Sequence, residues 1–154
     1  MEDTNFKLYN KRRTSRWIQD SILSEKCSLE HINFIFCSDT YLNKKNVEYL
    51  QHDTFTDVIT FNYSEVANML EGEIYISVDR VLENSQFYNI PFYYELYTVM
   101  IHGVLHLIGY NDKNDKDQLL MKKKEKQYLN KLEEFNIELN TGIKEFRSLC
   151  KNNR

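Results

Sequence analysis

The sequence predicts an α+β fold: a small mixed β-sheet covered by helices, with a metal site at the end of a central apolar helix. Short segments of alternating polarity, typical of strands, lie between segments whose apolar residues recur at helical spacing. The expected order is helix, strand, helix, two strands and three helices, which is typical of an α+β domain. One long and strongly apolar segment, 92–108, predicts the central helix.

The first part of the chain predicts two helices with a strand between them. Thr14 and Ser15 are candidate caps for a helix with one apolar face, formed by Trp17, Ile18, Ile22 and Leu23. Residues 31–37 alternate in polarity and predict a strand. Ser38 and Asp39 then indicate the cap of a second helix, whose apolar residues are Tyr41, Leu42, Val47, Tyr49 and Leu50.

The middle of the chain predicts two more strands and a third helix. The strands are expected at 57–63 and 73–78, the second entered through Gly72. Asp79 is expected to cap the helix that carries Val81, Leu82 and Phe87.

The last two helices are separated by a glycine turn. Pro91 is tolerated in a first helical turn, so the apolar helix is expected to span Phe92–Ile108 and to end at Gly109. Asn114 and Asp115 indicate the start of a final helix, with the apolar residues Leu119, Leu120, Tyr128, Leu129 and Leu132.

Length and composition indicate one globular domain. A chain of 154 residues can bury a core but is too short for two ordinary domains. Its 42% hydrophobic and 14% aromatic content argues against disorder. Because the apolar pattern fades beyond about Asn136, we expect a single domain over residues 1–140 and a C-terminal tail over residues 141–154.

The cysteines and the apolar segments predict a soluble, cytoplasmic protein without a membrane partner. Cys27, Cys37 and Cys150 are odd in number and far apart, which favours free thiols in a reducing compartment. The N-terminus lacks the apolar region of a secretory signal. The longest apolar stretch, 96–110, is too short to cross a bilayer.

The charge pattern by itself favours ordinary solvated faces. The net charge is −3, whereas nucleic-acid-binding domains are usually basic. Basic residues nevertheless gather in two stretches, which leaves room for a basic face: Lys7, Lys11, Arg12, Arg13 and Arg16, and then Lys122, Lys123, Lys124, Lys126 and Lys131.

The segment 102–112, HGVLHLIGYND, carries the chemistry. His102 and His106 are four residues apart, so both imidazoles project from one helix face and can bind one divalent ion. From this spacing alone, two buried histidines bonded to backbone carbonyls remain an equal alternative. Gly109 permits a sharp turn, and Asp112 lies on the returning segment as the expected third ligand; Asp115 and Asp117 fit this role less well. Three ligands and an open position are typical of catalytic metal sites.

This segment resembles the signature of the YbeY family of ribosomal RNA maturation factors, H-G-x-L-H-L-x-G-Y-D-H. The matching residues are His102, Gly103, Leu105, His106, Leu107, Gly109 and Tyr110. Residues 56–61 and 72–77 are similar to the family's T-[DN]-V-L-S-F and G-D-I-x-I-S strands, and Glu95, Leu96, Met121 and Glu125 also fit. The resemblance extends from the first helix to about Leu132.

The resemblance implies a metal-dependent, single-strand-specific endoribonuclease that acts in small-subunit ribosomal RNA maturation and ribosome quality control. It implies one Zn²⁺ per chain, held by His102, His106 and Asp112. Its partners would be ribosomal RNA and the small ribosomal subunit or its proteins. No residue is assigned as the general base.

Two positions depart from the family pattern. The family's third histidine is Asp112 here, and a carboxylate makes the site one unit less positive, its bound water less acidic, and manganese or iron more plausible. The family's Y-R-x-x-D stretch falls on residues 49–53, where Leu50 replaces the arginine. Leucine cannot stabilise the charge of a phosphorane. Lys44, Lys45 and His52 are candidate replacements.

Two alternative functions remain open. One is a non-catalytic, metal-stabilised ribosome assembly factor, which the two departures favour. The other is a zincin-like metallopeptidase, disfavoured because those enzymes use HExxH and Gly103 stands in place of the glutamate. Glu95 is expected either near the metal or simply as a helix-start carboxylate, and Asp57 either near the cleft or as a cap of the strand entry.

Overall fold

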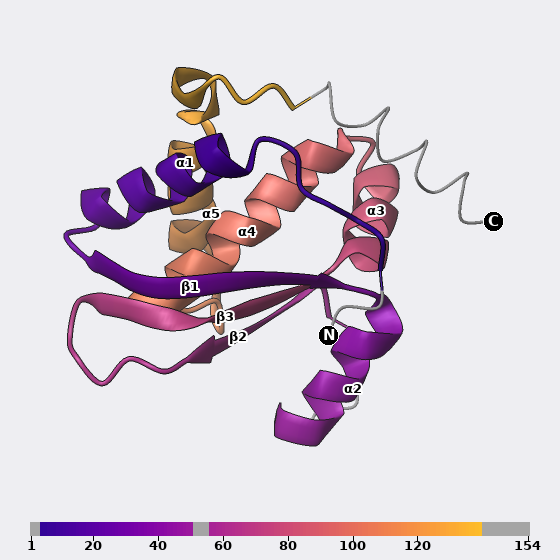
Figure 1. The fold of residues 1–154 in the computed structure, drawn as a ribbon, viewed down its shortest axis with the longest axis horizontal. Helices are drawn as coiled ribbons and strands as arrows, with labels where there is room; N and C mark the ends of the chain where they lie inside the picture. The colour runs from indigo at the N-terminus through magenta and orange to yellow at the C-terminus, as the bar shows by residue number, and fades with distance from the viewer. Residues whose placement is uncertain (1–3, 51–55, 140–154) are drawn as a thin grey trace.

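The computed structural model describes residues 4–50 and 56–139. The elements follow in the predicted order, which confirms the α+β class (Figure 1). In chain order they are α1 (Lys11–Ser24), β1 (Ser28–Cys37), α2 (Asp39–Leu50), β2 (Val58–Asn62), β3 (Met69–Ser77), α3 (Val78–Phe87), α4 (Phe92–Ile108), α5 (Asp115–Leu129) and the 3₁₀ helix η1 (Leu132–Phe135).

The sheet has three strands in the order β1-β3-β2. β3 runs parallel to β1 and antiparallel to β2, so the predicted mixed sheet is confirmed. Gly72 does not mark the entry of β3, as the sequence indicated, because β3 begins at Met69. A Cβ atom on Gly72 would lie 2.3 Å from the carbonyl oxygen of Phe61. The close approach of β2 therefore requires glycine at this position.

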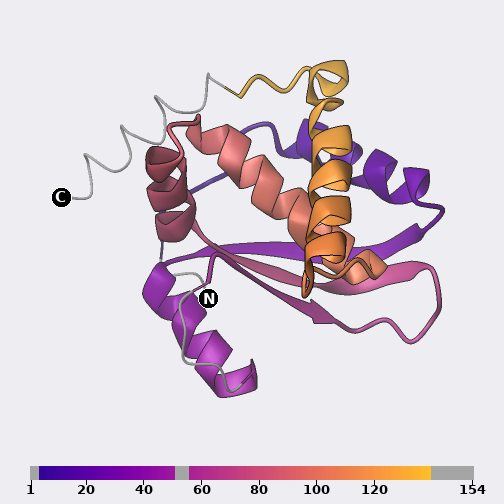
Figure 2. The same ribbon diagram turned by 180° about the vertical axis from the view of Figure 1, so that it is seen from behind.

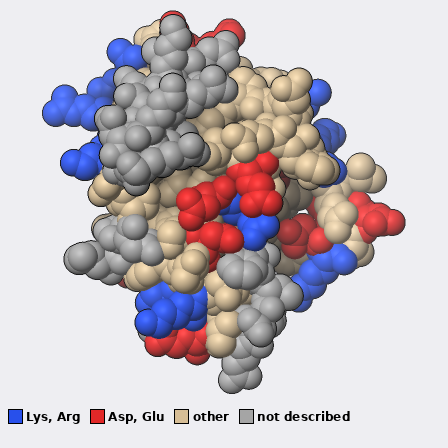
Figure 3. Space-filling model, turned by 90° about the vertical axis from the view of Figure 1, so that its right-hand side faces the viewer, with Lys and Arg blue, Asp and Glu red and all other residues tan. Residues whose placement is uncertain are grey.

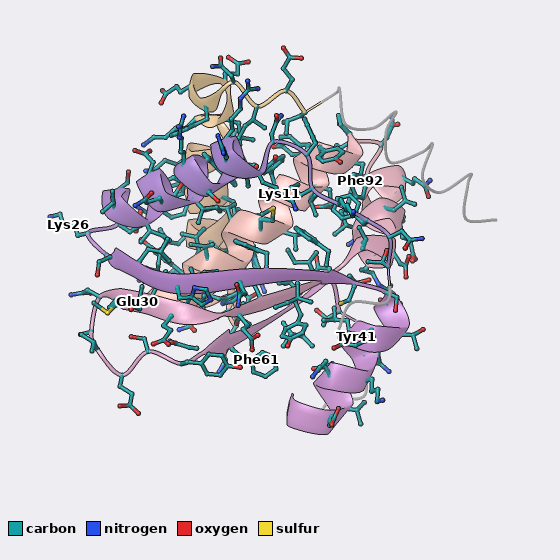
Figure 4. All side chains as sticks on the ribbon, viewed as in Figure 1. Lys11, Lys26, Glu30, Tyr41, Phe61 and Phe92 are labelled. Carbon is teal, nitrogen blue, oxygen red and sulfur yellow. The ribbon has the colours of Figure 1, made fainter. Side chains whose placement is uncertain are left out.

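Helices cover the two faces of the sheet unequally. Figures 1 and 2 show α1, α3, α4 and α5 on one side of the sheet, and α2 beside one end on the other side. The main core lies under the first group, and a smaller cluster of Cys37, Leu42 and Ile59 lies under α2. In Figure 4, Phe92 points among the helices, whereas Phe61 lies on the opposite side of the sheet.

The central helix α4 spans Phe92–Ile108, as predicted, and packs directly on the sheet. Gly103 faces the strands, where an added Cβ atom would lie 2.8 Å from Cγ2 of Ile74. On another side of α4, Tyr97 packs edge-on against Trp17, and its hydroxyl is 2.8 Å from the hydroxyl of Thr14. Thus α1 and the sheet together hold α4 in place.

Helix caps agree only in part with the sequence predictions. The side chains of Ser38 and Asn114 accept hydrogen bonds from the N–H groups of Tyr41 and Asp117, as expected for caps. The Thr14 cap was wrong: α1 begins at Lys11, and Thr14 is buried against Tyr97.

The Asp79 cap was also wrong. Ser77 caps α3 by accepting a hydrogen bond from the N–H of Arg80. The carboxylate of Asp79 instead accepts a hydrogen bond from the N–H of Asp39, at the start of α2. The hydroxyl of the residue just before the helix reaches the free N–H, whereas Asp79 already lies within the first turn of α3.

Several apolar residues assigned to buried helix faces are exposed. They are Leu23, Val47, Phe87, Leu119 and Leu120, with exposed fractions from 44% to 81%. Each lies beside a buried stripe rather than within it, because the neighbouring elements cover a narrower face than the sequence spacing suggested. The side chains of Tyr49 and Leu50 and the predicted tail, residues 141–154, lie outside the described part, so the division at residue 140 stays a prediction.

Charged side chains of both signs lie close together on the described surface. Figure 3 shows acidic groups beside Lys and Arg side chains on one face. Several cations of the two basic stretches have internal partners: Arg13 donates to the carbonyl of Asn136, and Lys131 lies 3.9 Å from Asp20. Separately, the helices within residues 4–50 and 56–139 are all too short or too polar to cross a membrane.

We expect Gly72→Ala to destabilise the fold. The added methyl group meets a backbone carbonyl, which cannot rotate away, so β2 and β3 must separate locally. The expected loss is about 1–3 kcal/mol in the free energy of unfolding, measured by urea denaturation. The neighbouring Glu71→Ala is the control, since Glu71 is exposed and should change stability by less than about 0.5 kcal/mol. Equal stabilities of the two variants would contradict the packing argument.

Candidate metal centre

Three predicted ligands meet where α4 ends. His102 and His106 project from the last turns of α4, each with about a quarter of its side chain exposed. Figure 2 shows α5 in front of this part of α4. Gly109 has φ of 125°, a conformation that favours glycine, and ends the helix there. The chain then turns back and brings Asp112 to the two histidines.

The ligand atoms form a compact triangle. Nε2 of His102 and Nε2 of His106 are 2.9 Å apart. Oδ2 of Asp112 is 3.5 Å from the first of these nitrogens and 3.4 Å from the second. Tetrahedral zinc with bonds of about 2.0–2.1 Å places its ligand atoms roughly 3.3–3.4 Å apart, so the triangle fits a zinc-sized ion. Within the described residues, this is the group of three His, Cys, Asp or Glu side chains that converges in this way.

The outer nitrogens of both rings already have acceptors. Nδ1 of His102 is 2.7 Å from Oε2 of Glu125, and Nδ1 of His106 is 3.0 Å from the carbonyl oxygen of Tyr110. A carboxylate and a carbonyl only accept, so each Nδ1 carries the hydrogen in the neutral ring. Both Nε2 lone pairs therefore face each other and the carboxylate of Asp112. Three acceptors at this distance repel one another unless a cation lies between them, either a proton on the ring of His102 or a metal ion, so the group could hold a metal ion.

Glu125 orients His102 and changes its protonation. Burial lowers the pKa of His102, but the hydrogen bond and charge of Glu125, together with the charges of Asp57 and Asp112, outweigh it and raise the pKa above its usual value. The sequence indicated Glu95 as a candidate for a place beside the metal. Glu125 on α5 is instead the carboxylate bonded to His102. It was among the residues that fit the family, but only the packing of α5 on α4 reveals its role.

A cleft of about 310 Å³ opens beside the triangle. Its lining includes His102, Asp112, Glu125, Asp57, Glu95 and Lys122. Burial raises the pKa of Asp57. Burial, with the charges of Asp57 and Glu125, raises the pKa of Glu95 to about 7. The carboxyl groups of Asp57 and Glu95 both line the cleft. The backbone carbonyl of Asp57 also accepts a hydrogen bond from the N–H of Ser77.

The residue in the position of the missing arginine, Leu50, has its side chain outside the described part of the structure. Leu50 is the last residue of α2, and residues 51–53 with His52 lie outside the described part. Of the candidate replacements, Lys45 lies over the ring of Tyr75, with Nζ 5.6 Å from the ring centroid. Among the described residues that line the cleft, the lysine is Lys122.

Comparisons with known proteins identify the family of this chain. The family model described as Endoribonuclease YbeY matches residues 2–133. The chain belongs to the endoribonuclease YbeY family. This confirms the predicted family and, with it, the predicted enzyme class, an endoribonuclease. A zincin-like metallopeptidase needs a glutamate directly after its first metal-binding histidine. The residue after His102 is Gly103, which faces the sheet.

The relatives cover most of the chain. A protein named Endoribonuclease YbeY from Amoebophilus asiaticus is 57% identical over 129 residues, covering 84% of this chain and 88% of its own. One of the same name from Flavobacterium psychrophilum is 46% identical, covering 90% and 96%. A solution structure of a Thermotoga maritima protein is 30% identical with a TM-score of 0.61, covering 82% and 85%.

We expect Glu125→Ala to weaken metal binding. Without the carboxylate, Nδ1 of His102 loses its acceptor and the ring can turn or change tautomer. Loss of such a partner lowers metal affinity by about 10–100-fold. Competition for Zn²⁺ with a chromophoric chelator measures this change. Lys126→Ala, at the next residue of α5, is the control and should bind like the wild type; equal affinity of the two variants would remove the role of Glu125.

We expect Glu95 to make the metal-free protein less stable as the pH rises. Its pKa is about 7 in the folded state against an ordinary 4.5, so the folded protein holds this proton more tightly than the unfolded chain. The cost of burying Glu95 is therefore small below about pH 4.5, grows up to pH 7, and persists above it. Glu95→Gln removes the titration.

The comparison is made by urea denaturation in the presence of a chelator, at pH 5 and pH 8. Relative to the wild type, Glu95→Gln should gain about 1–2 kcal/mol between these pH values, an amount already reduced for the partial exposure of the carboxyl. A difference between the two proteins that is the same at both pH values would show that Glu95 titrates normally.

Proposed function

We propose that this protein is a metal-dependent endoribonuclease that cleaves single-stranded RNA, with one Zn²⁺ bound by His102, His106 and Asp112. The supporting observation is the triangle of three acceptor atoms, whose two histidines have their outer nitrogens already bonded. When bound, the ion supplies Lewis-acid activation of a phosphodiester and of water. Membership in the endoribonuclease YbeY family supports RNA as the substrate.

The side chains around the triangle have separate tasks. Glu125 keeps the hydrogen on Nδ1 of His102, and the carbonyl of Tyr110 keeps it on Nδ1 of His106, so both Nε2 atoms stay available as ligands. Glu95, with a pKa of about 7, can accept or release a proton in the cleft near neutral pH. The carboxylates of the cleft repel phosphate, which favours RNA contact at the cation site and near Lys122.

The proposal includes the biological setting that the family resemblance implied. The RNA would be ribosomal, the process small-subunit maturation and ribosome quality control, and the partner the small ribosomal subunit or its proteins. We also place the protein in the cytoplasm. The buried thiols of Cys27 and Cys37, which are reduced in the structure, support this location, since such thiols are typical of reducing compartments.

We expect Asp112→Ala to lose most of its metal, whereas Asp112→His should keep it. Histidine restores the three-histidine set of the family pattern and supplies a nitrogen where alanine supplies nothing. Elemental analysis of protein purified without chelators measures metal content and identifies the ion. Retention of metal in Asp112→Ala would exclude Asp112 as a ligand, and manganese or iron in the wild type would correct the choice of zinc.

Cleavage of an unstructured RNA then tests the activity. The wild type should cut it, and His106→Ala, purified in the same way, should lose at least about 100-fold in rate, since it loses a metal ligand. A duplex of the same sequence should resist both proteins. Equal cutting by the two proteins would indicate contamination and overturn the nuclease. A wild type that binds metal but leaves the RNA intact would favour the non-catalytic assembly factor.

A further inference from the structure

A buried carboxylate is hydrogen-bonded to the segment that follows α4, next to the candidate metal centre. Glu25 follows the last residue of α1, and only 7% of its side chain is exposed. Its carboxylate accepts hydrogen bonds from the hydroxyls of Tyr110 and Tyr128 and from Nζ of Lys124, at 3.1 Å for the lysine. The two tyrosines and the lysine come from the segment after α4 and from α5, about 85 to 103 residues further along the chain.

These three donors keep Glu25 charged. Burial raises the pKa of a carboxyl, but the hydrogen bonds from Tyr110, Tyr128 and Lys124 outweigh it, and the pKa of Glu25 falls below its usual value. Hydrogen bonds to an ionised carboxylate are stronger and more directional than those between neutral groups. Glu25 therefore holds the side chains that donate to it firmly in place.

One of these attachments leads directly to the metal ligands. Tyr110 follows Gly109, and its carbonyl oxygen accepts the hydrogen bond from Nδ1 of His106. Asp112 stands two residues after Tyr110 on the same returning segment. When the Tyr110 side chain is held in place, its backbone carbonyl, which orients His106, is held as well. The short segment that leads from Tyr110 to Asp112 is then held at its start.

We propose that Glu25 is a positioning residue for the metal centre: through the hydroxyl of Tyr110 it holds the segment that orients His106 and places Asp112. The inference deepens the proposed function and rests on its metal site. The hydrogen bonds of the Glu25 carboxylate described above are not to the ligands, so it acts through Tyr110. Tyr110 is the hydrogen-bond partner of the ligand His106, and Glu25 is the partner of Tyr110.

The second tyrosine provides a matched control. Tyr128 lies on α5, and its hydroxyl bonds the same carboxylate. Glu125, the partner of His102, is on the same helix, but its place there is set by the helix backbone, whereas Tyr110 belongs to the segment between helices that carries Asp112. Tyr110→Phe and Tyr128→Phe each remove one hydroxyl and one hydrogen bond to Glu25. If Glu25 only joined α1 to α5, Tyr110→Phe and Tyr128→Phe would change the metal affinity by the same amount.

The experiment measures Zn²⁺ affinity by chelator competition for the full-length wild type, Glu25→Gln, Tyr110→Phe and Tyr128→Phe. Urea denaturation of each metal-free protein gives the stability separately. Tyr110→Phe and Glu25→Gln should bind Zn²⁺ about 10–100-fold more weakly than the wild type. Tyr128→Phe should stay within about threefold of the wild type, even where its metal-free stability falls as much as that of Tyr110→Phe.

A buried hydrogen bond elsewhere on α1 supplies a further control. Thr14→Val removes the contact with the hydroxyl of Tyr97, which belongs to α4 and not to the ligand segment, and should lower stability without changing Zn²⁺ affinity. If Glu25→Gln does not fold, the two tyrosine variants decide the question by themselves. Equal affinities for Tyr110→Phe and Tyr128→Phe would overturn the positioning role and leave the metal site intact. Absence of Zn²⁺ binding by the wild type would overturn both.

Discussion

The contact between α4 and the sheet determines where the chemistry can occur. Gly103 lets the helix approach Ile74 so closely that one turn of α4 presents its backbone to the strands. Because residues four apart share a helix face, His102 and His106 lie together beside this buried turn, where His102 meets Glu125 of α5 and lines the cleft. Gly109 ends α4 just beyond His106, and the returning segment brings Asp112 to the same two histidines.

The metal centre is an arrangement of acceptors that α5 and the chain turn complete. Glu125 and the carbonyl of Tyr110 occupy the outer nitrogens, so in the neutral rings the inner nitrogens are acceptors. Such a set is unfavourable without a cation and favourable with one, since lone pairs and a carboxylate repel each other at about 3 Å. Asp112, which stands in place of the family's histidine, also supplies an acceptor atom, because a carboxylate oxygen accepts as an imidazole nitrogen does. Its negative charge makes the site less positive.

The acidic cleft has a consequence for the substrate. Asp57, Glu95 and Glu125 line it together, and their mutual proximity contributes to the raised pKa of Glu95. A phosphodiester would be repelled by ionised carboxylates unless the bound cation and Lys122 compensate. The protein would therefore bind RNA through few electrostatic contacts near the cleft, and its affinity would depend strongly on whether the metal is present.

The sequence by itself determined the order of the elements, the limits of α4 and the three ligand candidates, because helical periodicity, a terminating glycine and histidine spacing are local signals. It did not determine the caps at Thr14 and Asp79, or which apolar residues face the core, because neighbouring elements decide these. Packing between distant helices brought Glu125 to His102 and Glu25 to Tyr110. Their roles arise from contacts between helices distant in the chain, such as the 85 residues that separate Glu25 from Tyr110, and no local pattern records them.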